Sequence, residues 1–237
     1  MEARYLVVSG VAFNKNFAIS DLHFCDRGIT CWERTNFASQ EEHDEFILYN
    51  LRQWAMKAPN DCTLWNLGDF GNVHMLEAYK EALTIPGKNI CLYLICGNHE
   101  SAKDIPLLEK YFDKVYEYPV YLSQKLILSH EPVWPLAEFC CNICGHLHNA
   151  ALDSDNHVCV SAKLVNYKPY KFTSLNKVFA KLPDRNMRFL WEPYADQYKI
   201  LNDRNDLVYD PVTRKIDLAA SRALQKSMRD ENWNLLK

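Results

Sequence analysis

The sequence predicts an α/β fold. Short apolar runs alternate along the chain with longer polar stretches of helical periodicity, which is typical of strands and helices that follow one another. Candidate metal ligands come directly after five of the apolar runs, as expected where loops meet at the carboxyl ends of strands. The 237 residues are 48% hydrophobic, which is enough for one good-sized core.

The strands and helices are predicted from this alternation. Ser39 is expected to cap the first helix, because Glu42 three residues later completes a capping box. In chain order, strands are predicted at Tyr5–Val8, Phe17–Ile19, Thr63–Leu67, Ile90–Ile95, Val120–Tyr121, Leu126–Leu128, Asn142–Cys144 and Val158–Val160. Helices are predicted at Gln40–Met56, Val73–Leu83, Ile105–Tyr111 and Leu218–Asp230.

The composition changes after about residue 177. From there the chain is charged, aromatic and interrupted by Pro183, Pro193 and Pro211, and it carries no further chemical motif. We therefore interpret residues 1–177 as the unit that carries the chemistry. Residues 178–237 are interpreted as an appendage that serves as a lid, a dimer surface or a buttress. The oligomeric state is left open, with a dimer among the alternatives.

Charge and cysteine usage exclude several classes of protein. The formal net charge is −3, so no overall basic field is present to hold long nucleic acid, although a nucleotide-sized substrate fits. Nine cysteines without a regular framework indicate a reducing, cytoplasmic compartment. The spacing of Cys141 and Cys144 also occurs in zinc sites, but without a second pair we favour buried thiols. No apolar run approaches the roughly 18–20 residues of a membrane span.

Five short segments carry the residues with metal-binding chemistry. In Asp21-x-His23 and His146-x-His148, side chains two residues apart on extended backbone point the same way, so both can reach one ion. Carboxylate, amide and imidazole ligands together suit Mn²⁺, Fe or Zn²⁺ rather than Ca²⁺. Asp-x-His and Gly-Asp alone are weak signals and Gly-His-x-His after a strand is a stronger one, and five of the eight histidines fall within these segments. The segments are Asp21-Leu22-His23, Gly68-Asp69, Gly97-Asn98-His99-Glu100, Ser129-His130 and Gly145-His146-Leu147-His148.

The ordered set of motifs resembles the calcineurin-like metallophosphoesterase superfamily, and within it the small single-domain bacterial and phage members. The similarity extends over about residues 17–175. Beyond the candidate ligands, it rests on Ile19-Ser20-Asp21-Leu22-His23-Phe24, Leu67-Gly68-Asp69-Phe70-Gly71, Leu128-Ser129-His130-Glu131-Pro132 and Asn166-Tyr167-Lys168-Pro169.

The resemblance implies a four-layer αββα sandwich with two divalent ions at the carboxyl ends of the strands. Asp69 would bridge the ions and His99 would protonate the leaving group. The first ion would be held by Asp21, His23 and His148, and the second by Asn98, His130 and His146. Mn²⁺ is the first choice of metal, with Fe, Zn²⁺, Ni²⁺ and Mg²⁺ as alternatives.

The implied activity is hydrolysis of a small phosphate monoester or diester, with a nucleotide as the expected substrate, by in-line attack of a metal-bridging hydroxide. The alternatives are a nuclease, a protein phosphatase or a scaffold that keeps the fold without catalysis. Arg27 and Arg34 follow the first ligand pair, and His74 lies five residues past Asp69. These three are predicted to contact substrate, against the alternative that they are ordinary surface residues.

Overall fold

A computed structural model describes residues 13–182 except 124, 151 and 153, together with the backbone of residues 208–209 and 216–217. The chain divides into two units, Met1–Pro183 and Asp184–Lys237. In the second unit, β10 (Val208–Tyr209) and β11 (Ile216–Asp217) form an antiparallel pair. The predicted strand Tyr5–Val8 and helix Leu218–Asp230 lie outside the described residues, and the boundary after residue 177 stays a prediction.

The first unit contains a five-stranded sheet with the order β4-β3-β2-β1-β9. Its four strands β1 to β4 run parallel, and β9 pairs antiparallel with β1. The strands are β1 (Asn16–Ile19), β2 (Cys62–Asn66), β3 (Ile90–Ile95), β4 (Lys114–Tyr116) and β9 (Tyr170–Lys171). Because β1, β2 and β3 are parallel, the loops that follow them emerge at one edge of the sheet.

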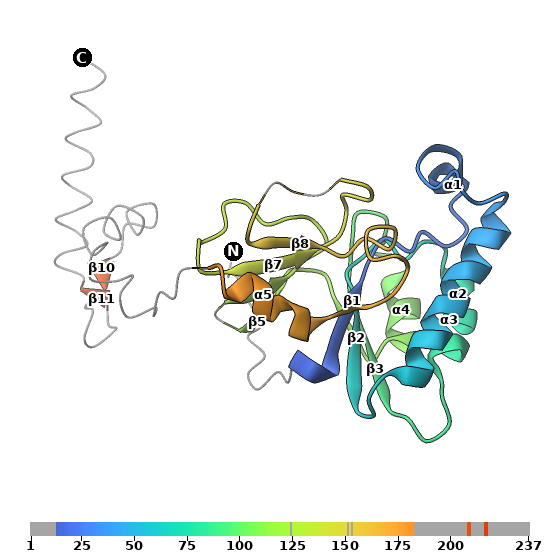
Figure 1. Ribbon diagram of the computed structural model, residues 1–237, viewed down its shortest axis with the longest axis horizontal. Coiled ribbons are helices and arrows are strands. Elements are labelled where there is room, and N and C mark those ends of the chain that lie inside the picture. The colour runs from blue at the N-terminus through green and yellow to red at the C-terminus, as the bar shows by residue number, and fades with distance from the viewer. Residues whose placement is uncertain are drawn as a thin grey trace, which may run out of the picture. The chain divides into compact units, whose positions relative to one another are not determined.

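Helices cover one face of this sheet. Figure 1 shows α2 (Gln40–Lys57), α3 (Leu76–Leu83) and α4 (Ile105–Tyr111) on the side of β1–β3 that faces away from β5, β7 and β8. Leu51 of α2 and Tyr79 of α3 belong to the same buried cluster as Phe17 and Ile19 of β1. The predicted cap of α2 is confirmed, because the Ser39 side chain accepts a hydrogen bond from the Glu42 backbone N–H.

The other face of the sheet shares a core with a second, four-stranded sheet. This sheet has the order β5-β6-β7-β8, with β6, β7 and β8 parallel and β5 antiparallel to β6. Ala18 and Trp65 of the first sheet and Leu128 and Ile143 of the second lie in one buried cluster. The strands are β5 (Val120–Ser123), β6 (Leu126–Leu128), β7 (Cys141–Cys144) and β8 (His157–Cys159).

The structure confirms the predicted α/β class and adds elements that the sequence did not indicate. In the first unit these are β4, β9, α1 (Arg27–Trp32) and α5 (Asn176–Phe179), as well as the 3-10 helices η1 (Phe13–Lys15) and η3 (Phe172–Leu175). The predicted helix Val73–Leu83 begins as the 3-10 helix η2 (Val73–Met75) and continues as α3. After β9, the described residues of the first unit hold only η3 and α5 (Asn176–Phe179). The second outer helical layer implied by the resemblance therefore stays a prediction.

None of the helices in the described residues combines the length and the apolar character that crossing a bilayer requires.

Candidate metal centre

Strand ends from both sheets bring the predicted ligands together. Asp21 and His23 follow β1, Asp69 follows β2, and Asn98 follows β3, whereas His130 follows β6 and the His146–His148 pair follows β7. Backbone hydrogen bonds join the first two loops, because the N–H groups of Asp21 and His23 donate to the carbonyls of Gly68 and Asp69. The side chains of the seven predicted ligands thus converge on one place.

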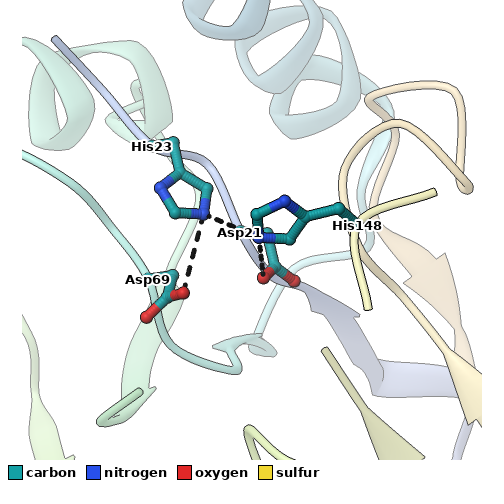
Figure 2. Close-up of side chains that lie close together, drawn as sticks. All are labelled: Asp21, His23, Asp69 and His148. Atoms are coloured by element: carbon teal, nitrogen blue, oxygen red, sulfur yellow. Dashed lines mark hydrogen bonds and ion pairs between the residues drawn. The ribbon is translucent and has the colours of Figure 1, made fainter. Parts of the chain in front are cut away.

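The first group consists of Asp21, His23, Asp69 and His148, whose candidate ligand atoms all lie within 4.8 Å of one another. The Nε2 atoms of His23 and His148 are 3.1 Å apart. Figure 2 shows the His23 ring directed at Asp69 and the His148 ring directed at Asp21, with N···O distances of 3.6 and 3.5 Å. Ligands about 2.1 Å from one ion stand roughly 3.0–3.4 Å apart, so these separations fit a shared cation.

The second group consists of Asp69, His130 and His146, and Asn98 lies beside it. Asn98 Oδ1 is 2.9 Å from His130 Nε2 and 3.0 Å from His146 Nδ1. The two imidazole nitrogens are 3.2 Å apart, and His130 Nε2 is 3.4 Å from Asp69 Oδ2. These spacings again suit donors around one ion.

Asp69 belongs to both groups. Its Oδ2 atom is buried and accepts no hydrogen bond of adequate geometry, although His23 and His130 nitrogens lie 3.6 and 3.4 Å away. A buried carboxylate oxygen without a partner is costly unless something neutralises it. Bound cations would remove that cost, so the residues present fit a metal centre.

Unusual backbone geometry marks the same residues. Asp21, His23, Asp69, His146 and His148 have φ values between 45° and 66°, the left-handed region that costs a side-chain-bearing residue about 1–2 kcal/mol. Such outliers cluster at functional sites, where the surrounding fold holds them in place. Here five of the seven predicted ligands adopt this conformation. The extended backbone predicted for Asp21-x-His23 and His146-x-His148 is therefore wrong, and His146 and His148 belong to different ligand groups rather than to one.

The second nitrogen of three histidines is held by the protein. His23 Nδ1 lies 3.2 Å from Asp26 Oδ2, and His130 Nδ1 lies 2.8 Å from the Leu67 carbonyl. His148 Nδ1 contacts the Glu33 carboxylate. Metal-binding histidines characteristically direct their other nitrogen to a carboxylate or carbonyl, which fixes the ring orientation.

Two glycines allow the loops to approach the carboxylates. A Cβ atom on Gly97 would lie 2.3 Å from Asp69 Oδ1, and one on Gly145 would lie 2.6 Å from Asp21 Oδ2. The Asp21 carboxylate also accepts hydrogen bonds from the Ser161 hydroxyl and the His146 backbone N–H. Both carboxylates are therefore placed by close backbone contact.

The electrostatics differ between the two groups. Burial lowers the pKa of His23 to about 4, against the opposing effect of Asp69 and Asp21, so this imidazole is neutral near pH 7, as a metal ligand must be. Burial also acts to lower the pKa of His130, but contact with Asp69 outweighs it and raises the value to about 9. In turn, burial acts to raise the pKa of Asp69. Contact with His130 more than offsets this effect, so the pKa of the Asp69 carboxyl lies below its usual value.

The candidate metal centre opens into a cleft of about 420 Å³. His99 lies on its wall with half of its side chain exposed, and His99 Nε2 is 3.9 Å from Asp69 Oδ2. The His99 backbone N–H donates to the other carboxylate oxygen of Asp69. The cleft is lined by Glu33, Asp69, Asn98, His99, His146, Leu147, His148, Asn149 and Ala150.

The three predicted substrate contacts lie elsewhere. Arg34 is 1% exposed, and its guanidinium donates to the Asp21 and Leu22 carbonyls and contacts His43. We therefore correct its role to support of the Asp21–His23 loop, because these partners hold it in the interior. Arg27 and His74 are exposed and do not line the cleft, so their contact with substrate stays a prediction.

Sequence reasoning missed three acidic residues, Asp26 beside His23, Glu33 and Glu100. Glu100 lies in a quoted motif but received no role, and its carboxylate accepts hydrogen bonds from the backbone N–H groups of Asp69, Phe70 and Gly97. Glu33 gave no signal, because its partner His148 is 115 residues away in the sequence. For Glu100, the clue in the sequence was its position directly after Asn98-His99.

Comparison with known proteins gives a fold but no family. No protein family matches the chain, and no curated protein does. A protein of unknown function from Aquifex aeolicus is 24% identical, with a TM-score of 0.53, over 69% of this chain and 98% of that one. The nuclease MPE from Pseudomonas putida is 20% identical, with a TM-score of 0.40, over 60% of this chain and 72% of that one. The first likeness shows a shared fold.

Proposed function

We propose that the chain is a metal-dependent phosphoesterase of the calcineurin-like superfamily, acting in the cytoplasm on a small phosphate ester such as a nucleotide. The proposal includes the four-layer αββα sandwich and two divalent ions, with Mn²⁺ as the first choice. One observation carries it. The buried Oδ2 of Asp69, which accepts no hydrogen bond of adequate geometry, lies between two groups of imidazole nitrogens at ligand spacing.

The roles of the chain's own residues follow from their positions. Asp21, His23, Asp69 and His148 would hold one ion, and Asp69, Asn98, His130 and His146 the other. Bound divalent ions supply Lewis acidity, which activates water and offsets the charge that develops on a phosphoryl group.

His99 is the proposed general acid. Its half-exposed ring stands on the cleft wall beside Asp69, where it can give a proton to a leaving oxygen. Asp69 also accepts the hydrogen bond of the His99 backbone N–H, so the same residue that joins the two ligand groups positions the acid. Asp26, Glu33, Glu100 and Arg34 would orient the ligands and their loops.

Metal content and hydrolysis test the proposal together. Purified wild type, Asp69→Asn and His74→Ala proteins are loaded with metal and analysed for bound ions, and nucleotides, cyclic nucleotides and aryl phosphates are assayed with Mn²⁺, Mg²⁺, Ni²⁺ and Zn²⁺. We expect two ions in wild type and in His74→Ala, because His74 lies outside the cleft lining, and loss at both sites in Asp69→Asn. One ion or none in wild type, or no metal-dependent hydrolysis, would contradict the proposal.

A further inference from the structure

The wall of the cleft carries acidic charge and no permanent positive charge. Among the described residues that line it, Glu33 and Asp69 are acidic and none is lysine or arginine. The Glu33 side chain is 35% exposed, and its carboxylate contacts His148 Nδ1. The cleft therefore offers a phosphate ester a carboxylate next to the candidate metal ligands.

Two cationic side chains close to Glu33 in the structure or the sequence are directed elsewhere. Lys163 Nζ donates to the Glu33 backbone carbonyl at 2.6 Å. Arg34 is buried and donates to the carbonyls of Asp21 and Leu22. Neither is among the residues that line the cleft, so within the described lining the proposed ions are the source of permanent positive charge for the substrate.

The charge supplied by the proposed ions is limited. Two divalent cations bring four positive charges, of which the carboxylates of Asp21 and Asp69 offset two. The histidine and asparagine ligands bind as neutral groups and offset none. The activated water takes up part of the remaining two charges, and Glu33 adds a negative charge on the wall. This balance accommodates one negative charge of an ester better than two.

We propose that the cleft selects phosphodiesters over phosphomonoesters and that Glu33 sets this preference. A diester carries a single negative charge, whereas a monoester carries nearly two above its second pKa of about 6. The inference rests on the proposed function, which it deepens by naming the substrate class.

The test compares two esters with the same leaving group, bis(p-nitrophenyl) phosphate and p-nitrophenyl phosphate. The quantity measured is the ratio of their kcat/KM values on one metal-loaded preparation, so changes in metal occupancy or folding cancel. Assays at pH 8.5 keep the monoester a dianion, because its second pKa is about 6. We expect wild type to favour the diester.

Two variants change the charge of the wall. Glu33→Gln removes the negative charge while its amide oxygen can still accept from His148, and Ala150→Lys adds a cation at an exposed wall position. Each should lower the diester-to-monoester ratio, by about fivefold at low salt for unit charges several ångströms apart. The effect should shrink as ionic strength rises. Glu45→Gln, an exposed position on α2, makes the same change in net charge and should leave the ratio unchanged.

A binding experiment supplies a readout that does not depend on turnover. Calorimetry measures the affinity of metal-loaded protein for phenylphosphonate, a dianion, and methyl phenylphosphonate, a monoanion. Wild type should bind the monoanion more tightly than the dianion, and Glu33→Gln should reduce this difference in affinity. A monoester preference, a tighter dianion complex, or ratios unchanged in both charge variants would overturn the inference while leaving the phosphoesterase proposal standing. Absence of all metal-dependent hydrolysis would instead reject the proposed function, and the phosphonate affinities would still decide the charge preference.

Discussion

Replacing Gly145 by alanine should disrupt the candidate metal centre through a single methyl group. The added Cβ would lie 2.2 Å from Ser20 Oγ and 2.6 Å from Asp21 Oδ2. Ordinary contacts begin near 3.4 Å, so the carboxylate oxygen has to retreat by about 0.8 Å. Ser20 cannot simply turn aside, because its hydroxyl is buried and donates to the same oxygen.

A shift of Asp21 Oδ2 by this amount moves the whole carboxylate, including Oδ1, which faces His148 Nε2, by more than a metal site tolerates. Metal–ligand distances hold to within about 0.2 Å, so Asp21 should be lost as a ligand. Mn²⁺ affinity should then fall by at least about 100-fold, beyond the 10–100-fold typical when only a supporting residue is removed. Without metal, overpacking of this buried position should cost about 1–3 kcal/mol of the free energy of unfolding.

Chelator competition measures the Mn²⁺ affinity, and urea unfolding in EDTA measures the stability of the metal-free protein. Gly87→Ala is the matched control. Gly87 has φ +77° with nothing within 4 Å of an added Cβ, so alanine there costs about 1–2 kcal/mol of backbone strain far from the ligands. Gly145→Ala protein with wild-type Mn²⁺ affinity would refute the assignment of Asp21 as a ligand.

Three further outcomes are expected. His99→Ala should retain both ions and lose turnover by about 10²–10⁴-fold on nucleotide substrates, with a smaller loss on p-nitrophenyl esters; equal losses on both would exclude the acid role. Glu100→Gln should lower the free energy of unfolding in urea by about 1–3 kcal/mol. The amide leaves one backbone N–H donor without an acceptor. Part of the lost stability is offset because the native carboxylate is itself costly to bury: burial raises its pKa despite the three N–H groups that donate to it. An unchanged free energy of unfolding would exclude the supporting role of Glu100. Contact with Asp69 raises the pKa of His130 to about 9 against the effect of burial, so Mn²⁺ binding at pH 7 should release a proton and strengthen as the pH rises toward 9. Calorimetry in buffers of different ionisation enthalpy measures that proton, and binding without its release would contradict the assignment of His130.

Site residues could be predicted from the sequence where they directly follow a strand. Asp21, Asp69 and His146 each come within a few residues of a strong apolar run, and parallel strands deliver such residues to one edge. The short edge strands β4 and β9, with three and two residues, were missed because such short segments carry almost no periodicity. Their pairing is fixed by the neighbouring strand.

Tertiary contacts account for the remaining differences. Arg34 reads as a surface charge in a polar loop, yet the fold buries it against two carbonyls and His43. The pairing of Glu33 with His148 joins α1 to the loop after β7, which no local pattern encodes. The helix α1 itself begins at the Asp26 cap, although Gly28 and Thr30 in its first turns lower its intrinsic helix propensity.

Each ligand group draws residues from both sheets of the first unit. The first takes Asp21, His23 and Asp69 from loops after β1 and β2 but His148 from the loop after β7, and the second joins Asp69 to His130 and His146. An ion in either group would therefore act as a cross-link between the two sheets, in addition to their apolar packing and to the hydrogen bonds that Asp21 accepts from Ser161 and His146. Because Ala18 lies in the core between the sheets and β1 leads directly to Asp21, a core substitution that changes the spacing of the sheets would also change the spacing of the ligands. The hydrophobic core thereby sets the dimensions of the ion-binding pocket.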